Sequence, residues 1–361
     1  MSTATAAGAE TKLSTISPLD DDRWDEFINN HPLSSVFHTR AWLTALQRTY
    51  GYQPVALASA SPDASLQNGI VFCRVDSWIT GRRLVSVPFA DHCAPLITDP
   101  AQLSTFIANL KESLPEPGLK YLELRPRIEL PAANSAFSSV HSYCLHELDL
   151  SPPLETLFQN FHKDSIQRKI RRAEKERLTY DEGRSQDLVE IFYRLLVKTR
   201  QRHGLPPQPI EWFHNLTQAF GEALKIRVAF SAGRAIAAIL TLQYKDTLVY
   251  KYGASDVRFS ASGGTQLLFW ESIQEAKRRG LRRFDLGRSD WSNSGLITFK
   301  KRWGASAAKL AYFRMPVSST AMPDPLSGDG DWLRQRLKHF LQLVPRPALR
   351  WIGRRIYRHI G

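Results

Sequence analysis

The sequence predicts a mixed α/β protein built from two halves of similar organisation. Its 361 residues are enough for two domains of roughly 150 residues each. Short runs typical of strands alternate with longer segments of helical periodicity, and this order occurs twice along the chain. Ser151-Pro152-Pro153 separates the two occurrences, because a serine can cap the next helix and proline suits its first turn. We therefore expect one half at 18–150 and the other at 151–317.

The elements of the N-terminal half are predicted in order. Residues 1–17 are small and polar, and we expect a disordered tail. Two helices should follow within 24–50, broken at His31-Pro32, and a third within 101–114, stopped by Pro115 and Pro117. The expected strands lie at 55–60, 69–76, 84–87, 121–124 and 142–150.

In the C-terminal half, apolar residues at helical spacing predict helices at 154–177 and 186–203. The later elements are a strand at 248–254, a helix at 265–279, a strand at 282–286, a short helix at 296–303 and a strand at 308–313. Gly263 and Gly264 directly precede the helix at 265–279. Since free backbone N–H groups at a helix N-terminus can hold a phosphate-bearing ligand, Gly263, Gly264 and Thr265 are candidate donor-binding residues.

Several short motifs follow one another in the C-terminal half. They are Tyr250-Lys251-Tyr252-Gly253-Ala254-Ser255-Asp256, Phe284-Asp285-Leu286-Gly287-Arg288-Ser289, Gly295-Leu296, Phe299-Lys300 and Trp303-Gly304. Upstream, His162-Lys163-Asp164-Ser165 and the segment 199–204 add to the pattern. In this order the motifs resemble the FemAB-type proteins of the GNAT acyltransferase superfamily, which include BioF2-like acetyltransferase domains. The resemblance runs from about residue 36 to residue 313 and is vaguer in the N-terminal half.

The resemblance implies two GNAT-like domains in tandem and an acyltransferase activity. The acceptor would be an amine or hydroxyl on a cell-envelope glycan, its lipid-linked precursor or an exopolysaccharide-related molecule. Acyl-CoA is the expected donor substrate, with no tightly bound cofactor, and aminoacyl-tRNA in a peptidoglycan-precursor ligase is the alternative. Gly263-Gly264 departs from the superfamily's commoner arginine/glutamine and glycine loop for pyrophosphate, which weakens acyl-CoA relative to other donors. A catalytically idle scaffold for polysaccharide synthesis at the membrane is the alternative from another class.

Lys300 and Asp285 are the residues that we expect to carry the chemistry. Lys300 follows Phe299 in the family's Phe-Lys pattern, and an ammonium group beside the reacting carbonyl would stabilise the developing oxyanion or the leaving group. Asp285 ends a strand, where it would position or deprotonate the acceptor, although an aspartate there also caps loops.

Other residues are candidates for substrate binding. Arg202 ends a helix and matches a family arginine that the resemblance links to acceptor phosphate, for which a planar guanidinium is well suited. The remaining candidates for the pocket lining are Tyr252, Asp256, Arg288, Asn293 and Lys301. The alternatives are that Tyr252 is a core aromatic and that Lys301 is solvated.

Positive charge is concentrated in the C-terminal half. Residues 1–150 carry a net charge of −5 and residues 151–361 a net charge of +18, which gives +13 for the chain. A basic surface of this size raises the local concentration of polyanions such as CoA, tRNA, phospholipid or nucleotide sugar. The helix expected at 154–177 is especially basic, either as a solvated face or as a ledge for phosphates. No helix-turn-helix, RRM or zinc pattern accompanies it, so we expect no sequence-specific nucleic-acid binding.

The chain changes in composition after residue 317. Residues 318–330 are rich in Ser, Pro, Gly and Asp and are expected to form a linker. Residues 331–361 carry eight Lys/Arg and one acidic residue among many aliphatic and aromatic ones, and Pro345 and Pro347 divide them into two short amphipathic helices. We expect these helices to lie on an anionic membrane surface. Packing on the protein's own core and binding of tRNA or another partner are the alternatives.

Cysteine usage and targeting signals indicate the compartment. Cys73, Cys93 and Cys144 form neither a disulfide framework nor a zinc-binding spacing, so we expect a reducing compartment and no metal site. The first residues do not resemble a signal peptide, and no apolar run is long enough to cross a bilayer. We therefore expect a cytoplasmic protein that associates peripherally with the inner face of the cytoplasmic membrane.

Overall fold

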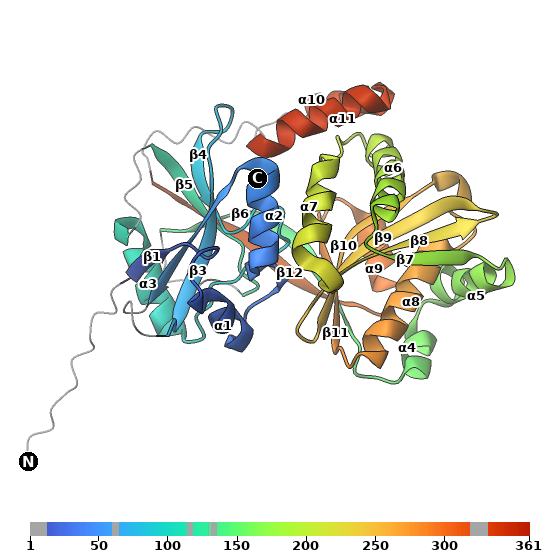
Figure 1. The fold of residues 1–361 in the computed structure, drawn as a ribbon, viewed down its shortest axis with the longest axis horizontal. Helices are drawn as coiled ribbons and strands as arrows, with labels where there is room; N and C mark the ends of the chain where they lie inside the picture. Colours follow the sequence, from blue (N-terminus) through green and yellow to red (C-terminus); the bar gives the residue numbers. More distant parts are fainter. Residues whose placement is uncertain (1–12, 60–64, 114–117, 129, 131–135, 318–330) are drawn as a thin grey trace, which may run out of the picture.

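The structure is a computed structural model that describes residues 13–59, 65–113, 118–128, 130, 136–317 and 331–361. Its strands form one twelve-stranded sheet in the order β1-β2-β3-β4-β5-β12-β6-β11-β10-β9-β8-β7. Figure 1 shows that helices gather around the two ends of this sheet, so that the molecule has two lobes. The expected mixed α/β architecture in two halves is confirmed.

The N-terminal lobe begins with an edge strand and ends at the centre of the sheet. Its elements are β1 (Leu13–Ile16), α1 (Arg23–Asn30), α2 (Arg40–Tyr50), β2 (Gln53–Ser59), β3 (Asn68–Val75), β4 (Arg82–Val85), α3 (Pro100–Ser113) and β5 (Leu119–Leu124). β1 pairs with β2, so the expectation that residues 13–17 are disordered is wrong. Residues 1–12 and the helix stop at Pro115 and Pro117 lie outside the described residues.

The C-terminal lobe carries the longer run of elements. They are β6 (Ser138–Asp149), α4 (Leu154–Asn160), α5 (Arg168–Lys175), β7 (Thr179–Gly183), α6 (Gln186–Arg202), α7 (Ile210–Phe220), β8 (Leu224–Ser231), β9 (Arg234–Tyr244), β10 (Thr247–Ser255), α8 (Gly264–Arg278), β11 (Arg283–Ser289) and α9 (Ser294–Lys301). The sequence pattern assigned no element between 205 and 247, where α7, β8 and β9 lie.

The single helix expected at 154–177 is broken in the structure. Phe161 ends α4 in an extended conformation, and its buried ring contacts Trp303 with ring centroids 4.9 Å apart. The next residue, His162, donates its backbone N–H to the carbonyl oxygen of Arg302 at 2.9 Å. The chain then resumes through a π-helical turn (Lys163–Gln167) into α5. Packing of Phe161 against the C-terminal core overrides the local helical pattern.

The two lobes share a structural unit and are joined by one strand. In the N-terminal lobe β4 and β5 are parallel and are connected through α3, whereas in the C-terminal lobe β10 and β11 are parallel and are connected through α8. β12 (Ser306–Pro316) comes from the C-terminal part of the chain but lies between β5 and β6, antiparallel to both. The sheet is therefore continuous from one lobe to the other.

Two helices follow the lobes, α10 (Asp331–Leu343) and α11 (Arg346–Ile356). Figure 1 shows them lying along one side of the molecule, with the chain terminus close to α2. The expected pair of helices at 331–361 is confirmed, and the linker predicted at 318–330 lies outside the described residues. None of the helices in the described part of the chain is long and apolar enough to cross a membrane.

Candidate active site

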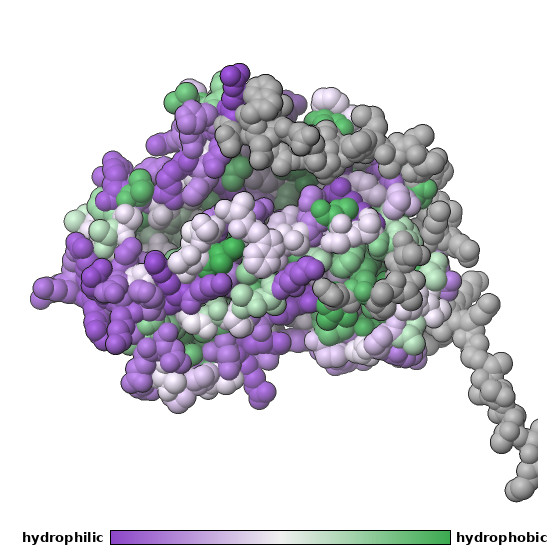
Figure 2. Space-filling view, turned by 180° about the vertical axis from the view of Figure 1, so that it is seen from behind, coloured by the Kyte–Doolittle hydropathy of each residue, from purple (hydrophilic) through white to green (hydrophobic). Residues whose placement is uncertain are grey.

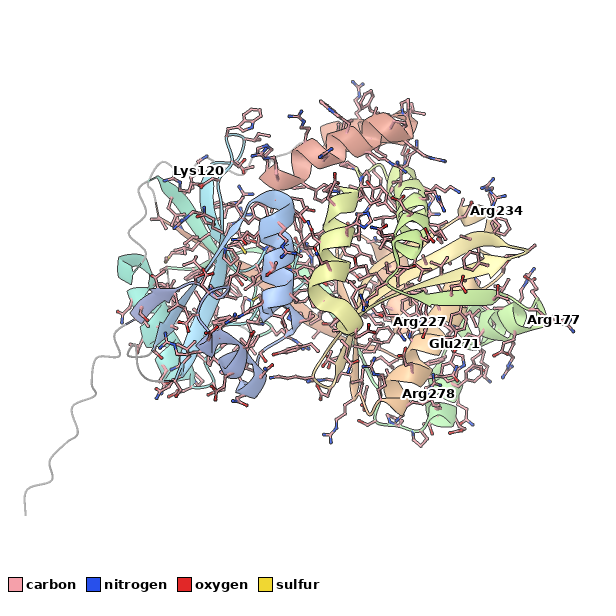
Figure 3. All side chains as sticks on the ribbon, in the orientation of Figure 1. Lys120, Arg177, Arg227, Arg234, Glu271 and Arg278 are labelled. Atoms are coloured by element: carbon pink, nitrogen blue, oxygen red, sulfur yellow. The ribbon has the colours of Figure 1, made fainter. Side chains whose placement is uncertain are left out.

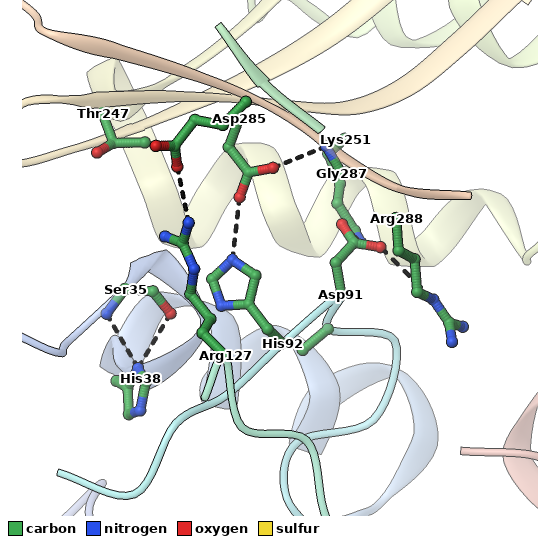
Figure 4. A network of polar contacts seen from close by, with 12 residues as sticks. Ser35, His38, Asp91, His92, Arg127, Thr247, Lys251, Asp285, Gly287 and Arg288 are labelled. Carbon is green, nitrogen blue, oxygen red and sulfur yellow. Dashed lines mark hydrogen bonds and ion pairs between the residues drawn. The ribbon is translucent and has the colours of Figure 1, made fainter. Parts of the chain in front are cut away.

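The candidate site lies where β10 and β11 separate. The two parallel strands pair only between residues 247–249 of β10 and residues 283–285 of β11. β10 nevertheless runs on to Ser255 and β11 to Ser289, so their carboxyl ends diverge. Figure 4 shows Asp91 and His92, from the loop between β4 and α3, meeting Lys251, Asp285 and Arg288 at this opening. A loop of the N-terminal lobe thus completes a site in the C-terminal lobe.

The structure brings Lys300 to this opening. Although it is a lysine at the end of a short helix, only 2% of its surface is exposed. Its Nζ donates hydrogen bonds to the carbonyl oxygens of Gly287 at 2.8 Å and Arg288 at 3.0 Å. Burial lowers the pKa of Lys300 to about 8, because the nearby carboxylates of Asp91 and Asp285 only partly offset the loss of hydration. An ammonium with two hydrogens on carbonyl oxygens keeps a third for a ligand.

Asp91 and Lys251 form a partly buried ion pair beside Lys300. Lys251 Nζ lies 2.9 Å from Asp91 Oδ2, and Arg288 Nε lies 3.8 Å from Asp91 Oδ1. Gly287 has φ +72°, and an added Cβ there would stand 3.1 Å from Asp91 Oδ2, so the close approach of the carboxylate favours glycine. The side chain of Asp91 is 14% exposed, against 6% for Lys251. Asp91 is therefore the more accessible partner of the pair.

The loop that presents Asp91 is held in an unusual conformation. Val87 and Phe89, which precede Asp91 in this loop, are non-glycine residues with φ of 57° and 59°. Arg125 Nη1 donates to the carbonyl oxygen of Val87 at 3.0 Å, and the hydroxyl of Tyr312 donates to that of Asp91 at 2.7 Å. Such left-handed residues persist only where their surroundings enforce them, and they cluster at functional sites.

Asp285 has its oxygens engaged by the protein itself. Oδ2 accepts a hydrogen bond from His92 Nε2 at 3.0 Å, and Oδ1 accepts one from the backbone N–H of Gly287 at 2.7 Å. Burial acts to raise the pKa of Asp285, but the hydrogen bond from His92, with smaller contributions from Arg127 and Gly287, outweighs it and leaves the pKa lowered. The geometry therefore favours a positioning role for Asp285 over proton abstraction. Both roles stay predictions.

The glycines that begin α8 are explained by packing. Gly263 has φ +81°, and an added Cβ would lie 2.1 Å from the carbonyl oxygen of Lys169 in α5. At Gly264 the added Cβ would lie 2.9 Å from Cδ1 of Ile236 in β9. Thr265 follows in the first turn of α8 and is half-buried. Close contact of α8 with α5 and β9 therefore requires small residues here, whether or not a donor binds; a donor role for all three stays a prediction.

Tyr252 and Asp256 are engaged within the protein. The Tyr252 hydroxyl accepts a hydrogen bond from Trp212 Nε1 at 2.9 Å, and burial raises the pKa of Tyr252. Asp256 accepts hydrogen bonds from Arg258 at 2.9 and 2.6 Å and pairs with Lys198 at 3.3 Å. These bonds hold the pKa of Asp256 far below its usual range. Tyr252 is thus a core aromatic and Asp256 an anchor of the loop before α8.

The remaining predicted residues lie at the surface or at the edge of the opening. Arg288 stacks on Tyr143 with its guanidinium carbon 4.1 Å from the ring centroid. Asn293 caps α9, since its Oδ1 accepts from Leu296 N at 3.1 Å. Lys301 is exposed. Arg202 is exposed at the end of α6, where its carbonyl oxygen accepts from Gln342 of α10 at 2.9 Å. Of these residues, only Arg288 touches the Asp91 and Lys251 pair.

Three members of the site were missed from the sequence, namely Asp91, His92 and Lys251. Lys251 stands between two tyrosines of a buried strand, at an irregularity in the pairing of β10 with β9. Asp91 and His92 are a polar pair within an otherwise apolar stretch. A charged residue in such surroundings is a usable signal, because it must find a partner when it is buried. Within the described residues no group of His, Cys, Asp or Glu side chains is arranged to hold a metal ion.

Comparison with known proteins defines the class. Residues 160–301 match the family described as an acetyltransferase (GNAT) domain. The fold is similar to the crystal structure of FemX, with a TM-score of 0.66 and 13% identity over 84% of this chain and 97% of that one. A tandem GNAT protein from the clavulanic acid biosynthesis pathway is also similar, with a TM-score of 0.53 and 9% identity over 86% of this chain and 100% of that one. Residues 160–301 therefore match a GNAT acetyltransferase domain, and the chain has a fold similar to those of FemX and of a tandem GNAT protein.

Sequence similarity then points to a particular relative. Over 139 residues the chain is 27% identical to the UDP-N-acetylmuramoylpentapeptide-lysine N(6)-alanyltransferase of Weissella viridescens. The match covers 37% of this chain and spans 40% of the length of that relative. Its name describes the transfer of an alanyl group to a lysine side-chain nitrogen.

Proposed function

We propose that the protein is an aminoacyltransferase, which joins an activated aminoacyl group to an amine of a cell-envelope precursor. The observation that carries this proposal is the buried ammonium of Lys300 at the opening between β10 and β11, inside the segment that matches the GNAT domain. A preorganised cation with one free hydrogen, shielded from solvent, is well suited to stabilise a developing oxyanion.

In the proposed mechanism the acceptor nitrogen attacks the carbonyl carbon of the aminoacyl ester. Lys300 donates a hydrogen bond to the carbonyl oxygen as it gains negative charge. The C–O ester bond then breaks, and the leaving oxygen takes up a proton while the new amide nitrogen loses one. Asp91 is the more exposed carboxylate of the site and is placed to receive that proton, whereas Asp285 holds His92 and the turn at Gly287.

The donor that we propose is an aminoacyl-tRNA. The alanyl transfer in the name of the similar relative favours an aminoacyl group over other acyl groups. The basic face of α5 favours a polyanionic carrier, because Arg168, Arg171 and Lys175 are exposed on it. Figure 3 shows Arg177 and Arg234 pointing outward from the same end of the molecule, and Figure 2 shows hydrophilic side chains crowding that end.

An acyl-CoA donor is the second candidate. It is favoured by the match of residues 160–301 to an acetyltransferase domain. It is disfavoured by the packing explanation for Gly263 and Gly264, which leaves those glycines without a need for a pyrophosphate ligand. We also propose a peripheral association with the membrane through 331–361, because this segment combines basic residues with exposed large apolar side chains.

The test compares Lys300→Met with Lys301→Met, a matched loss of charge at the neighbouring exposed residue. We expect Lys300→Met to lower kcat roughly 10²–10³-fold, the usual cost of losing one oxyanion donor, and Lys301→Met to change it little. Product would be followed by mass spectrometry with alanyl-tRNA or acetyl-CoA as donor and a UDP-linked muramoylpentapeptide as acceptor. Turnover only with acetyl-CoA would select the second candidate. No turnover with either donor would favour the idle scaffold.

A further inference from the structure

The two tail helices are fixed to both lobes of the protein. Leu341, Val344 and Leu349 are buried against it. An added Cβ on Gly353 would lie 1.9 Å from the carbonyl oxygen of Pro207, so α11 packs directly on the backbone before α7. At the end of the chain, the carbonyl oxygen of His359 accepts from Arg83 Nη2 in β4 at 2.8 Å. The alternative of packing on the protein's own core is therefore what the structure shows.

The exposed surface of the tail nevertheless includes large apolar side chains among its basic ones. The large hydrophobic side chains exposed there are Leu337, Phe340, Leu343, Trp351, Ile356 and Ile360. The turn between β3 and β4 adds to this surface, with Trp78 87% exposed and Ile79 49% exposed. The turn lies beside the end of the tail, since the ring centroids of Trp78 and His359 are 5.6 Å apart and Ser77 Oγ is 3.1 Å from His359 Nδ1. We call these residues together the apolar face.

A basic groove borders the apolar face. It is a cavity of about 570 Å³ between the end of α2, the start of α7 and α11. Four arginines line it, Arg48, Arg354, Arg355 and Arg358, together with Trp351. The groove has one carboxylate, Glu211, which is 3.3 Å from Arg354 Nη2. Positive charge thus exceeds negative charge in a hollow large enough for anionic headgroups.

We propose that the apolar face and the basic groove together form a docking surface for an anionic lipid bilayer. The inference deepens the membrane association proposed above and rests on it. Aromatic and aliphatic side chains beside arginines match the boundary between acyl chains and headgroups, where tryptophan is favoured. The new element is the turn at Trp78 and Ile79, which comes from the N-terminal lobe. Because tail and turn dock together, the bilayer meets the folded protein in one fixed orientation.

The positive charge of the tail favours an anionic bilayer over a soluble partner as the occupant of this surface. Residues 331–361 carry eight basic residues and one acidic residue. Each basic residue near an anionic leaflet strengthens binding roughly fivefold, so that three of them contribute about a hundredfold. A protein partner with an apolar patch would match the apolar face but would leave the arginines of the groove without a counter-charge.

The experiment measures cosedimentation of the full chain with vesicles of phosphatidylcholine alone or with phosphatidylglycerol added. We expect binding only with phosphatidylglycerol, weakened at high salt. The triple variant Arg354→Gln, Arg355→Gln, Arg358→Gln should bind about a hundredfold more weakly. The matched control is Arg278→Gln, Arg279→Gln, Arg282→Gln, which removes the same charge from exposed positions at the end of α8 and just after it, on the side of the molecule away from the tail (Figure 3), and should bind like the unmodified protein.

The turn is tested separately with Trp78→Ser and Ile79→Ser combined. Both residues are exposed, so the fold should survive, which circular dichroism checks, and vesicle binding should fall at least tenfold. The proposal is overturned if the two triple variants weaken binding equally, if the turn variant binds normally, or if phosphatidylglycerol vesicles are ignored. Turnover of a soluble acceptor is measured in parallel, so that loss of membrane binding and absence of transferase activity are told apart.

Discussion

The two parallel strand pairs of the molecule differ in how they end. Beyond β4 and β5 the gap is closed by the chain itself, since Ser86 N donates to the carbonyl oxygen of Glu123 at 2.7 Å and Cys93 N to that of Arg125 at 2.7 Å. Beyond β10 and β11 no such backbone bridge forms among the described residues, and charged side chains occupy the opening. The same unit is therefore sealed in one lobe and open in the other.

The ion networks of the two openings differ in the same way. In the N-terminal lobe Glu123 accepts from Arg125 at 2.9 Å and from Arg314 at 2.7 Å, which engages both carboxylate oxygens. In the C-terminal lobe Lys251 and Arg288 share Asp91, while Nη1 of Arg288 is buried without a hydrogen-bond partner in the described part of the chain. Because a polar group without a protein partner is free to bind a ligand, we expect the C-terminal lobe to hold the ligand.

Breaking the ion network of Glu123 in the N-terminal lobe should have the largest effect on stability. Arg125→Met leaves Glu123 buried with one cation fewer and removes the support of Val87, so we expect a loss of about 3–5 kcal/mol in the free energy of unfolding. Urea denaturation followed by circular dichroism measures it. Lys301→Met, at an exposed position, is the control and should change the stability by less than about 0.5 kcal/mol. A loss below about 1 kcal/mol for Arg125→Met would show that the ion network around Glu123 contributes little to stability.

The charged groups at the opening between β10 and β11 should make both activity and stability depend on pH. Lys300 is charged below its pKa of about 8. If the ammonium is the active form, kcat should be flat below that pH and fall about tenfold per unit above it. The unfolded chain keeps this proton up to about pH 10.4, so the contribution of Lys300 to stability should rise between these two values while activity falls. The dependence of kcat on pH is compared with that of Lys300→Arg, whose side chain stays charged over this range. Identical pH profiles for the two proteins would show that the fall in kcat does not come from deprotonation of Lys300.

The smallest expected effect concerns the cap that positions Lys300. Asn293→Ala removes the side-chain hydrogen bond to Leu296 N and should cost roughly 1 kcal/mol of stability. Because α9 carries Lys300, the same change should lower kcat severalfold without shifting KM. Thermal unfolding and steady-state kinetics give the two numbers. Asn293→Asp keeps a capping oxygen and should restore both; failure of this rescue would assign Asn293 a contact other than the cap.

Local signals in the sequence predicted much of the fold. α2 was expected, and it has a side-chain cap at Thr39 and a left-handed Gly51 at its end. α6 likewise has a serine cap and an inward apolar face. Lys300 was singled out because it follows Phe299 in a family pattern, and the structure places it at the opening between β10 and β11, while its catalytic role stays a prediction. These features depend on residues within a few positions of one another.

Features that depend on distant residues were not predicted. Asp91 reaches Lys251 across 160 positions and His92 reaches Asp285 across 193, through a loop with no helical or strand periodicity. The break at Phe161 depends on Trp303, which is equally remote in the sequence. Tertiary contacts decide such positions, so neither propensity nor spacing reports them.

The position of β12 has a consequence for how the protein is made. The strand pairs with β5 and β6 at once, yet it is synthesised after both lobes. During translation, one edge of β5 and one edge of β6 therefore stay unpaired until residues 306–316 have left the ribosome. Unpaired strand edges can pair with other chains and cause aggregation. An interruption of synthesis before residue 306 would thus yield an aggregation-prone fragment, even though most residues of both lobes would already be present.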